Sequence, residues 1–322
     1  MQTRSADHPA PRAAGPEVSG ILVIDKPAGM TSHDVVAAVR RILHIRQVGH
    51  FGTLDPFATG VLPLSLGKAT RFAQFYLKSR KAYQGAIRFG FSTDTYDATG
   101  ESLSAPVDCH PDAEAIERAF AAFTGRIAQT PPPFSAKRIK GVRAYELARR
   151  REPVELEPVE VEIYALELIA LEDGSARFSV ECSGGTYVRS LAHDVGQKLG
   201  CPAHLKSLRR TAVAEFKESQ AITLAELETL ARDGALDKVR ISLEQLLPEC
   251  PALVVRGREE KSVRHGHTFE LAQALRAGRG LRPDQAGHTP ISLLKILNAE
   301  RRLIAVARHV TGSVYHPDLV LV

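Results

Sequence analysis

The amino-acid sequence predicts an α+β protein: a mixed, largely antiparallel sheet flanked by helices, followed by a small β-rich C-terminal domain. Segments with the two-residue period of strands and segments with the helical period are mixed irregularly, which argues against a regular βαβ arrangement. In residues 83–91, 159–165 and 178–182, apolar side chains alternate with polar ones, as they do in antiparallel sheets. The 322 residues are enough for about two domains, each with its own core.

The first half of the chain contains a short apolar strand at residues 21–24 and then an amphipathic helix. Thr31 or Ser32 can cap this helix, because the apolar residues between 35 and 43 recur with the helical period. A glycine-rich loop follows at residues 49–62, then a helix at about 69–77 and the half-buried strand at 83–91. Residues 1–19, rich in Pro and Ala, are expected to form a disordered N-terminal tail.

In the second half, residues 112–123 and 188–199 show the helical period, and Gly200 is well placed to end the second helix. Between these helices lies a basic, Pro-containing segment at residues 131–155. A boundary near residues 246–251 separates the larger domain, residues 20–246, from a C-terminal domain, residues 250–322. The apolar runs of the C-terminal domain are short, which is typical of strands.

The composition is that of a soluble globular protein, with 44% hydrophobic and 25% charged residues. A net charge of +5 is compatible with an anionic partner but weakly indicative of one. The N-terminus lacks the apolar stretch of a signal peptide, and no apolar run approaches the ~20 residues that span a membrane. The sequence therefore predicts a cytoplasmic protein.

Neither the cysteines nor two superficial motifs indicate a metal or nucleotide site. Four cysteines (Cys109, Cys182, Cys201 and Cys250) form no CxxC pair, so we expect free thiols in a reducing compartment. The Gly60 to Lys68 stretch lacks the glycine spacing and the Ser or Thr of a phosphate loop. His265 and His267 have no third ligand at a regular spacing, so an exposed pair is expected.

The most informative segment is residues 49–62, GHFGTLDPFATGVL, which contains a single acidic residue, Asp55. Glycines on both sides supply backbone freedom, and Pro56 fixes φ directly after the acid. Such a loop can hold a carboxylate in a fixed position against a ligand. The pattern also fits a tight surface turn in which Asp55 bonds its own backbone.

This segment resembles the signature of bacterial tRNA pseudouridine synthases of the TruB type, GHxGxLDPxATG, in which the aspartate is catalytic. Four further segments are similar to the same family: residues 25–32, 81–97, 129–146 and 185–210. Their order and spacing match from about residue 20 to residue 216, and the likeness is looser in the C-terminal domain. Phe51 and Phe134 depart from frequent Thr and Tyr residues, which affects only expectations about loop packing.

The resemblance implies the pseudouridine synthase catalytic fold and isomerisation of a uridine in RNA, with no cofactor and no metal. Asp55 would act as the nucleophile at C1′ or would stabilise positive charge there while a sugar proton leaves, and both routes stay open. Arg189 would pair with Asp55, and Tyr83 would stack on the flipped base, with proton transfer as a second role open to it. The resemblance assigns His50, Tyr187 and Leu208 to substrate binding, and Lys26 and Asp97 to support of the pocket.

The partner implied by the resemblance is tRNA, bound through its T-loop and T-stem, with the T-loop uridine at tRNA position 55 as the target. Residues 131–155 would close over the RNA, and residues 250–322 take the place of a PUA-like RNA-binding domain. A solvated helix face explains Arg149 to Arg151 nearly as well. We expect a monomer without an obligate protein partner. Two alternatives are a tRNA-folding chaperone without essential catalysis and a synthase for another RNA.

Overall fold

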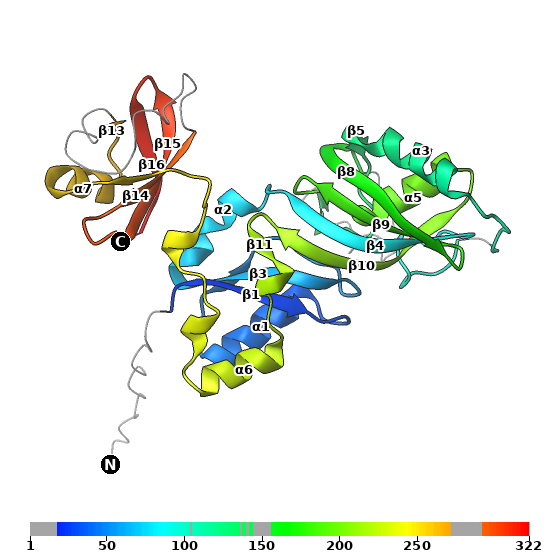
Figure 1. Ribbon diagram of the computed structural model, residues 1–322, viewed down its shortest axis with the longest axis horizontal. Helices are drawn as coiled ribbons and strands as arrows, with labels where there is room; N and C mark the ends of the chain where they lie inside the picture. Colours follow the sequence, from blue (N-terminus) through cyan, green and yellow to red (C-terminus); the bar gives the residue numbers. More distant parts are fainter. Residues whose placement is uncertain are drawn as a thin grey trace, which may run out of the picture.

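The computed structural model describes residues 18–103, 105–135, 137–139, 142–143, 156–271 and 292–321. A larger part built on a nine-stranded sheet is followed by a smaller part built on a five-stranded sheet (Figure 1). The α+β class, with a mixed and largely antiparallel sheet, is therefore confirmed. No helix among the described residues is long and apolar enough to cross a membrane.

The large sheet has the strand order β1-β3-β10-β4-β9-β8-β5, with β2 beside β3 and β11 beside β10. All its pairs are antiparallel except β3 with β10, which meet over Arg209 and Arg210. This parallel contact lies beside the loop that carries Asp55. The strands are β1 (Gly20–Lys26), β2 (Val48–His50), β3 (Thr59–Leu66), β4 (Lys81–Phe89), β5 (Gly125–Gln129), β8 (Val159–Glu172), β9 (Ser175–Cys182), β10 (Ala203–Val213) and β11 (Phe216–Lys217).

Helices cover the two ends of this sheet separately (Figure 1). The helix α1 (Ser32–Leu43) contacts α6 (Leu224–Arg232), whereas α3 (Ala113–Phe123) packs on β8 and α5 (Val188–Lys198) packs on β10. Thr31 caps α1 with a capping box completed by Asp34, and Gly200 follows α5 with φ +66°. An apolar core that includes Val39, Ile116 and Leu191 joins these helices to the sheet.

Two predictions in the first half need correction. Strands β2 and β3 occupy the two ends of the predicted loop at residues 49–62, so the loop itself is only residues 51–58. The single helix predicted at 69–77 is divided into a 3-10 helix, η1 (Gly67–Phe72), and a short α-helix, α2 (Ala73–Tyr76). Apolar spacing cannot separate these cases, because a 3-10 turn and an α-turn place similar residues inward.

The C-terminal part has the strand order β12-β14-β15-β16-β13, and the helix α7 (Gly257–Arg264) packs against it. Its strands are β12 (Ala252–Val254), β13 (Phe269–Glu270), β14 (Leu293–Leu297), β15 (Leu303–Thr311) and β16 (Val314–Val320). Val306 and Leu319 share one apolar cluster with Ile21 and Phe72 of the larger part. The two parts are therefore joined by a common core, and not only by a linker.

The prediction of free thiols is wrong for two of the four cysteines. Cys109 and Cys201 form a disulfide with Cα atoms 6.0 Å apart, whereas Cys182 and Cys250 are free. The pair is 92 residues apart in sequence. It comes together because the segment before α3 folds back beside the turn between α5 and β10, where Gly90 N–H donates to the Pro202 carbonyl at 2.8 Å.

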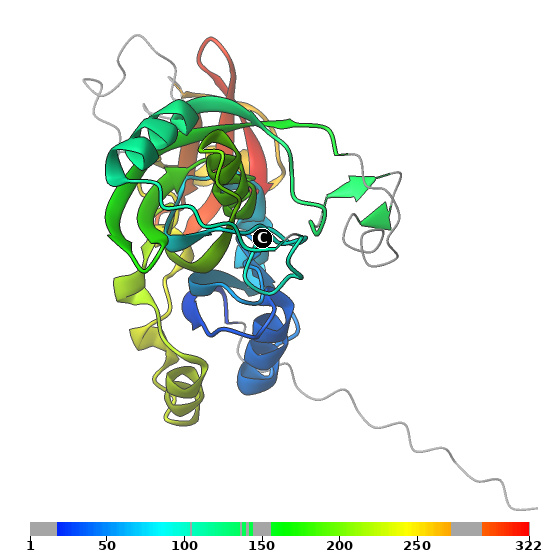
Figure 2. The same cartoon turned by 90° about the vertical axis from the view of Figure 1, so that its right-hand side faces the viewer.

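Two predicted segments lie largely outside the described residues. Of the predicted tail, residues 1–17 are not described, whereas Val18 and Ser19 pack and bond against the larger part. Within the predicted clamp at 131–155, residues 136, 140–141 and 144–155 are not described. Its described strands β6 (Arg138–Ile139) and β7 (Val142–Arg143) pair with each other and project beyond the body of the protein (Figure 2).

Candidate active site

Asp55 lies in the short loop between β2 and β3, and this loop is fixed from below by α1. Ser32, the first residue of α1, accepts from Leu54 N–H at 2.8 Å and donates to the Leu54 carbonyl at 3.1 Å. On the other side of Asp55, Gly29 N–H donates to the Pro56 carbonyl at 2.8 Å. The backbone on both sides of the acid is thus bonded to β1 and α1, so the direction of its side chain is set by rigid elements.

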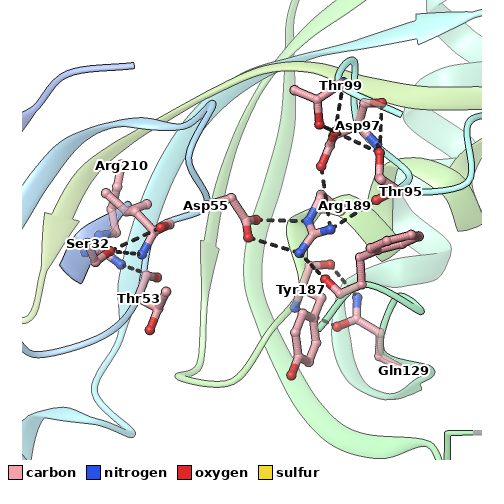
Figure 3. Close-up of polar contacts among 12 residues, drawn as sticks. Ser32, Thr53, Asp55, Thr95, Asp97, Thr99, Gln129, Tyr187, Arg189 and Arg210 are labelled. Carbon is pink, nitrogen blue, oxygen red and sulfur yellow. Dashed lines mark hydrogen bonds and ion pairs between the residues drawn. The ribbon is translucent and has the colours of Figure 1, made fainter. Parts of the chain in front are cut away.

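The carboxylate of Asp55 pairs with Arg189 through two contacts (Figure 3). Arg189 Nε lies 2.9 Å from Asp55 Oδ2, and its Nη2 donates to Asp55 Oδ1 at 3.0 Å. This two-point geometry is the one in which guanidinium and carboxylate bind most strongly. Side-chain bonding of Asp55 to its own turn is therefore not what holds it. The loop presents its acid to α5.

Arg189 also ties three chain segments together. Its Nη1 donates to the Thr95 carbonyl at 3.1 Å, and its Nη2 donates to the Phe134 carbonyl at 3.0 Å. The side chain is 7% exposed and lies in the first turn of α5, where the helix dipole disfavours a cation. Asp55 and a second acid, Asp97, compensate this charge, since Asp97 Oδ2 is 3.5 Å from Arg189 Nη1.

Asp97 organises the loop after β4. Its Oδ1 accepts from the Thr95 hydroxyl at 2.9 Å, from Thr99 N–H at 2.9 Å and from the Thr99 hydroxyl at 2.5 Å. The side chain is 5% exposed, so these donors replace water. Asp97 thus holds the segment whose Thr95 carbonyl bonds Arg189, and it adds a negative charge behind the Arg189–Asp55 pair.

The ionisation of Asp55 reflects opposing influences. Burial raises the pKa of Asp55, the Arg189 guanidinium lowers it, and the Asp97 charge raises it again. The Asp55 side chain remains 35% exposed, so a ligand can reach it. A carboxylate with a raised pKa is more basic than an ordinary aspartate, which suits a nucleophile, while the ion pair keeps its charged form available.

Lys26, the last residue of β1, lies beneath the same loop. Its Nζ donates to the carbonyls of Met30 at 2.6 Å, Pro27 at 2.9 Å and Pro56 at 3.1 Å. Burial lowers the pKa of Lys26 to about 8, and the Asp55 charge opposes that decrease. The Lys26 ammonium group therefore bonds backbone carbonyls on both sides of the site, and these bonds help to shape the loop.

The two tyrosines of the predicted site come from different elements. Tyr83 is a buried residue of β4, and burial raises its pKa to about 12. Tyr187 precedes α5, and its backbone N–H and carbonyl are both bonded by the Gln129 amide, at 2.8 and 3.0 Å. Burial is the main cause of the raised pKa of both phenols, and the Asp55 charge adds to it.

His50 and Leu208 lie on the strands that flank the loop. His50 ends β2, and its Nδ1 accepts from Gly52 N–H at 3.3 Å, so the ring helps to turn the loop. Leu208 is 7% exposed on β10 and, with Phe57, lines a cavity of about 400 Å³. Asp55 and Arg189 are not among the residues that line this cavity, so it is separate from the ion pair.

Sequence reasoning missed two buried residues that build the site. Gln129 is 1% exposed and clamps the start of α5, as described above. Arg210 is fully buried and donates to the carbonyls of Val61 at 2.8 Å, Gly52 at 3.1 Å and Thr53 at 3.3 Å, on the loop side of β3 (Figure 3). Both lie in matched segments, but a strand pattern alone predicts an exposed arginine at such a position.

Among the described residues, no three His, Cys, Asp or Glu side chains gather closely enough to hold a metal ion. His265 and His267 are exposed, with ring centroids 6.1 Å apart.

Comparison with known families gives a consistent result along most of the chain. The profile of the TruB family pseudouridylate synthase N-terminal domain matches residues 40–188, and that of the tRNA pseudouridylate synthase B C-terminal domain matches residues 189–248. The tRNA pseudouridine synthase B of Solibacter usitatus is 46% identical over 304 residues, which cover 94% of this chain and 100% of that protein. That of Geobacter sulfurreducens is 42% identical over 249 residues, or 77% of this chain and 82% of that protein.

Solved structures extend the likeness to the fold. A chain in the crystal structure of a Cbf5-Nop10-Gar1 complex aligns with a TM-score of 0.69 and 28% identity, over 91% of this chain and 79% of that one. A chain in the structure of an H/ACA RNP bound to a substrate RNA containing 2'-deoxyuridine aligns with a TM-score of 0.70 and 26% identity, over 94% and 84%. Sequence, fold and the matched profiles agree, and the chain belongs to the TruB family of pseudouridine synthases.

Proposed function

We propose that this protein converts one uridine of tRNA, the T-loop uridine at tRNA position 55, into pseudouridine. The observation that carries the proposal is the partly exposed Asp55 carboxylate, fixed at two points by a buried Arg189. Relatives named tRNA pseudouridine synthase B, at 42–46% identity, support tRNA as the substrate class. The T-loop position follows from the likeness of the catalytic segments to that family.

The reaction breaks the N1–C1′ bond of the nucleotide and joins C5 to C1′. No atom is gained or lost, since C5 loses one proton and N1 gains one. Asp55 either attacks C1′ or stabilises positive charge there, and both routes need its ionised form. The Arg189 guanidinium favours that form and fixes the position of the carboxylate, and the side chain keeps enough exposure for a sugar to approach.

A uridine within a folded T-loop has to leave its stack before Asp55 can reach C1′. We propose that Tyr83 and Tyr187 receive the flipped base, with Leu208 as an apolar contact and His50 in the gap left by the nucleotide. Aromatic stacking offsets about 1–3 kcal/mol of the cost per base. The basic strands β6 and β7, which project from the body, are suited to close on RNA phosphates, and the C-terminal part to hold the tRNA at a second place.

The test uses purified protein, an unmodified tRNA transcript and EDTA, with the product mapped to one nucleotide. Pseudouridine at the T-loop uridine is expected, and a matched transcript with cytidine at that position should yield none. Product at another uridine, or only in another RNA, would contradict the assigned substrate. The monomeric state is tested by light scattering of the protein alone and with tRNA.

The chaperone alternative separates from catalysis through Asp55→Asn. The enzyme hypothesis expects this variant to lose product formation while its affinity for tRNA stays within a few-fold of the parent protein. A chaperone would keep its whole effect on tRNA folding in the variant, and no pseudouridine would form even with the parent protein. The ion pair itself favours the enzyme, because a binding surface gains little from an acid neutralised by its own arginine.

A further inference from the structure

Arg210 presents a problem that the proposed chemistry does not explain. It is 0% exposed, and among the ion pairs of the described residues it has no carboxylate partner. Its neighbour Arg209, by contrast, binds both Asp25 and Glu218. A buried charge costs several kcal/mol, and a well-packed apolar residue of similar volume is often as stable or more so. A fully buried arginine without an acid therefore needs a further reason.

The hydrogen bonds of Arg210 explain only part of its presence. Its three carbonyl acceptors, on Gly52, Thr53 and Val61, fix the start of the loop that carries Asp55. The backbone comes so close here that a Cβ on Gly60 would lie 2.2 Å from the Arg210 carbonyl, and Gly60 has φ +98°. Neutral donors can also satisfy such carbonyls, so these bonds account for the forked shape of the side chain but do not by themselves require its charge.

Tyr83 is another neighbour of Arg210. Strands β4 and β10 pair these two residues directly, so their side chains leave the same face of the sheet. Burial raises the pKa of Tyr83 to about 12, and the charge of Arg210 opposes that increase. An arginine has donors only, so toward the Tyr83 hydroxyl it can act only as a donor to the oxygen, which leaves the hydroxyl proton for another acceptor.

Two lysines near Arg210, Lys26 and Lys81, add to its positive charge, whereas His50, whose pKa burial lowers, stays neutral. Burial lowers the pKa of Lys26, His50 and Lys81, and the Arg210 charge lowers each of them further. Lys81 donates to the carbonyls of Leu77 and Ser79 at 3.1 and 3.0 Å, so it too is bonded to backbone. The floor of the site therefore carries a positive potential that favours negative charge on an oxygen above it.

We propose that Arg210 is a positioning residue that acts through Tyr83, fixing the direction of its hydroxyl and stabilising negative charge on its oxygen while Tyr83 relays a proton. This inference rests on the proposed function, because it concerns one step of that reaction. Tyr83 is the group that meets the substrate. Arg210 is sealed beneath it and touches only protein.

When C5 of the detached uracil anion bonds C1′, C5 becomes tetrahedral and a double bond forms between N1 and C6. The C5–H bond then breaks, and its electron pair restores the C5–C6 double bond and returns the other pair to N1. The Tyr83 oxygen accepts the proton from C5, while its own hydroxyl proton passes to N1, directly or through water. If the hydroxyl proton of Tyr83 leaves before the C5 proton arrives, the Tyr83 oxygen carries negative charge, which Arg210 stabilises.

The experiment measures single-turnover pseudouridine formation in tRNA transcripts made with ordinary or 5-deuterated uridine. Arg210→Gln is expected to slow the reaction by about 10²-fold, the lower end for general acid–base catalysis. It should also raise the ratio of the two rates above that of the parent protein, because loss of the C5 proton becomes the slow step. Arg210→Lys keeps the charge, so its isotope ratio should stay at the parent value.

Arg209→Gln is the matched control, since Arg209 adjoins Arg210 but pairs with Asp25 and Glu218, and its isotope ratio should equal the parent ratio. An Arg210→Gln protein that is slow but has the parent isotope ratio would overturn the inference and leave Arg210 a structural residue. If Arg210→Gln does not fold, Arg210→Lys decides, because a raised ratio despite the retained charge refutes the role. Failure of the parent protein to form pseudouridine would instead refute the proposed function, and the inference with it.

Discussion

Replacement of Asp97 by asparagine tests how the charges of the site are balanced. The change keeps the size of the side chain but removes one of the two acids that face Arg189. Asp97 raises the pKa of Asp55, so its loss should lower that pKa. The proposed reaction requires ionised Asp55, so activity should be lost as the pH falls through its pKa. The acid limb of the pH–rate profile should therefore move to lower pH in Asp97→Asn.

The rate at neutral pH should fall in the same variant. Asp97 Oδ1 accepts three hydrogen bonds, and Oδ2 is 3.5 Å from Arg189 Nη1. An amide can replace only one oxygen, so either a bond to Thr95 or Thr99 or the contact with Arg189 is lost. One hydrogen bond to a charged group contributes about 1.5–3 kcal/mol, which corresponds to a fall in kcat of roughly 10- to 150-fold. KM should change little, because Asp97 is buried and out of reach of the RNA.

The assay is a set of single-turnover rates on the tRNA transcript between acid and neutral pH, with thermal unfolding measured at each pH. Asp94→Asn is the matched control: Asp94 lies in the same loop and accepts from Glu101 N–H at 2.8 Å. Its profile should match that of the parent protein. An acid limb that moves to higher pH in Asp97→Asn, or does not move while the rate falls, would refute the electrostatic argument.

Three further predictions concern stability. Removal of residues 250–322 should lower the free energy of unfolding of the larger part by several kcal/mol and lower its Tm sharply. Four buried apolar residues of the C-terminal part share a core with the larger part, and each contributes about 1.5–3 kcal/mol. A soluble truncated protein with unchanged Tm would contradict this. Tyr76→Phe removes a hydroxyl that donates to Glu215 at 2.5 Å and accepts from Leu247 N–H at 3.0 Å, so denaturant unfolding should show a loss of about 1–3 kcal/mol. Reduction of the Cys109–Cys201 disulfide should lower stability by about 2–4 kcal/mol, seen as a lower Tm in dithiothreitol that Cys201→Ser reproduces without reductant.

Much of the fold could be predicted because its signals are local. The alternation at residues 83–91 corresponds to β4, and the helical periods before Phe123 and before Gly200 correspond to α3 and α5. The helix α6 was missed although its start has a clear capping box, with Thr223 and Glu226 bonded reciprocally at 3.2 and 2.7 Å. Strand β3 was missed because glycines and Pro63 interrupt its apolar run, yet β1 and β10 on its two sides hold it in the sheet.

The geometry around Asp55 could not be predicted from local sequence patterns. Asp55 and Arg189 are 134 residues apart, and their pairing entered the prediction through family likeness alone. The disulfide likewise depends on two loops that only the folded chain brings together. Arg210 shows the limit most clearly. On a strand with period two, a charged residue is expected to face water, whereas the parallel contact of β3 with β10 makes Arg210 a buried donor to the loop that carries Asp55.

The distribution of charge around Asp55 connects the fold with the chemistry. Three cations contact the loop that carries Asp55. Arg189 pairs with the Asp55 carboxylate, Lys26 donates to the Pro56 carbonyl, and Arg210 donates to the Gly52 carbonyl. Asp55 is thus a carboxylate within a positive environment, compensated in part by Asp97. Arg189 and Lys26 oppose the increase that burial causes in the pKa of Asp55, and so support its ionised form. The positive environment also favours negative charge that develops later on the detached base, since the cations are already fixed by backbone carbonyls and need not reorganise.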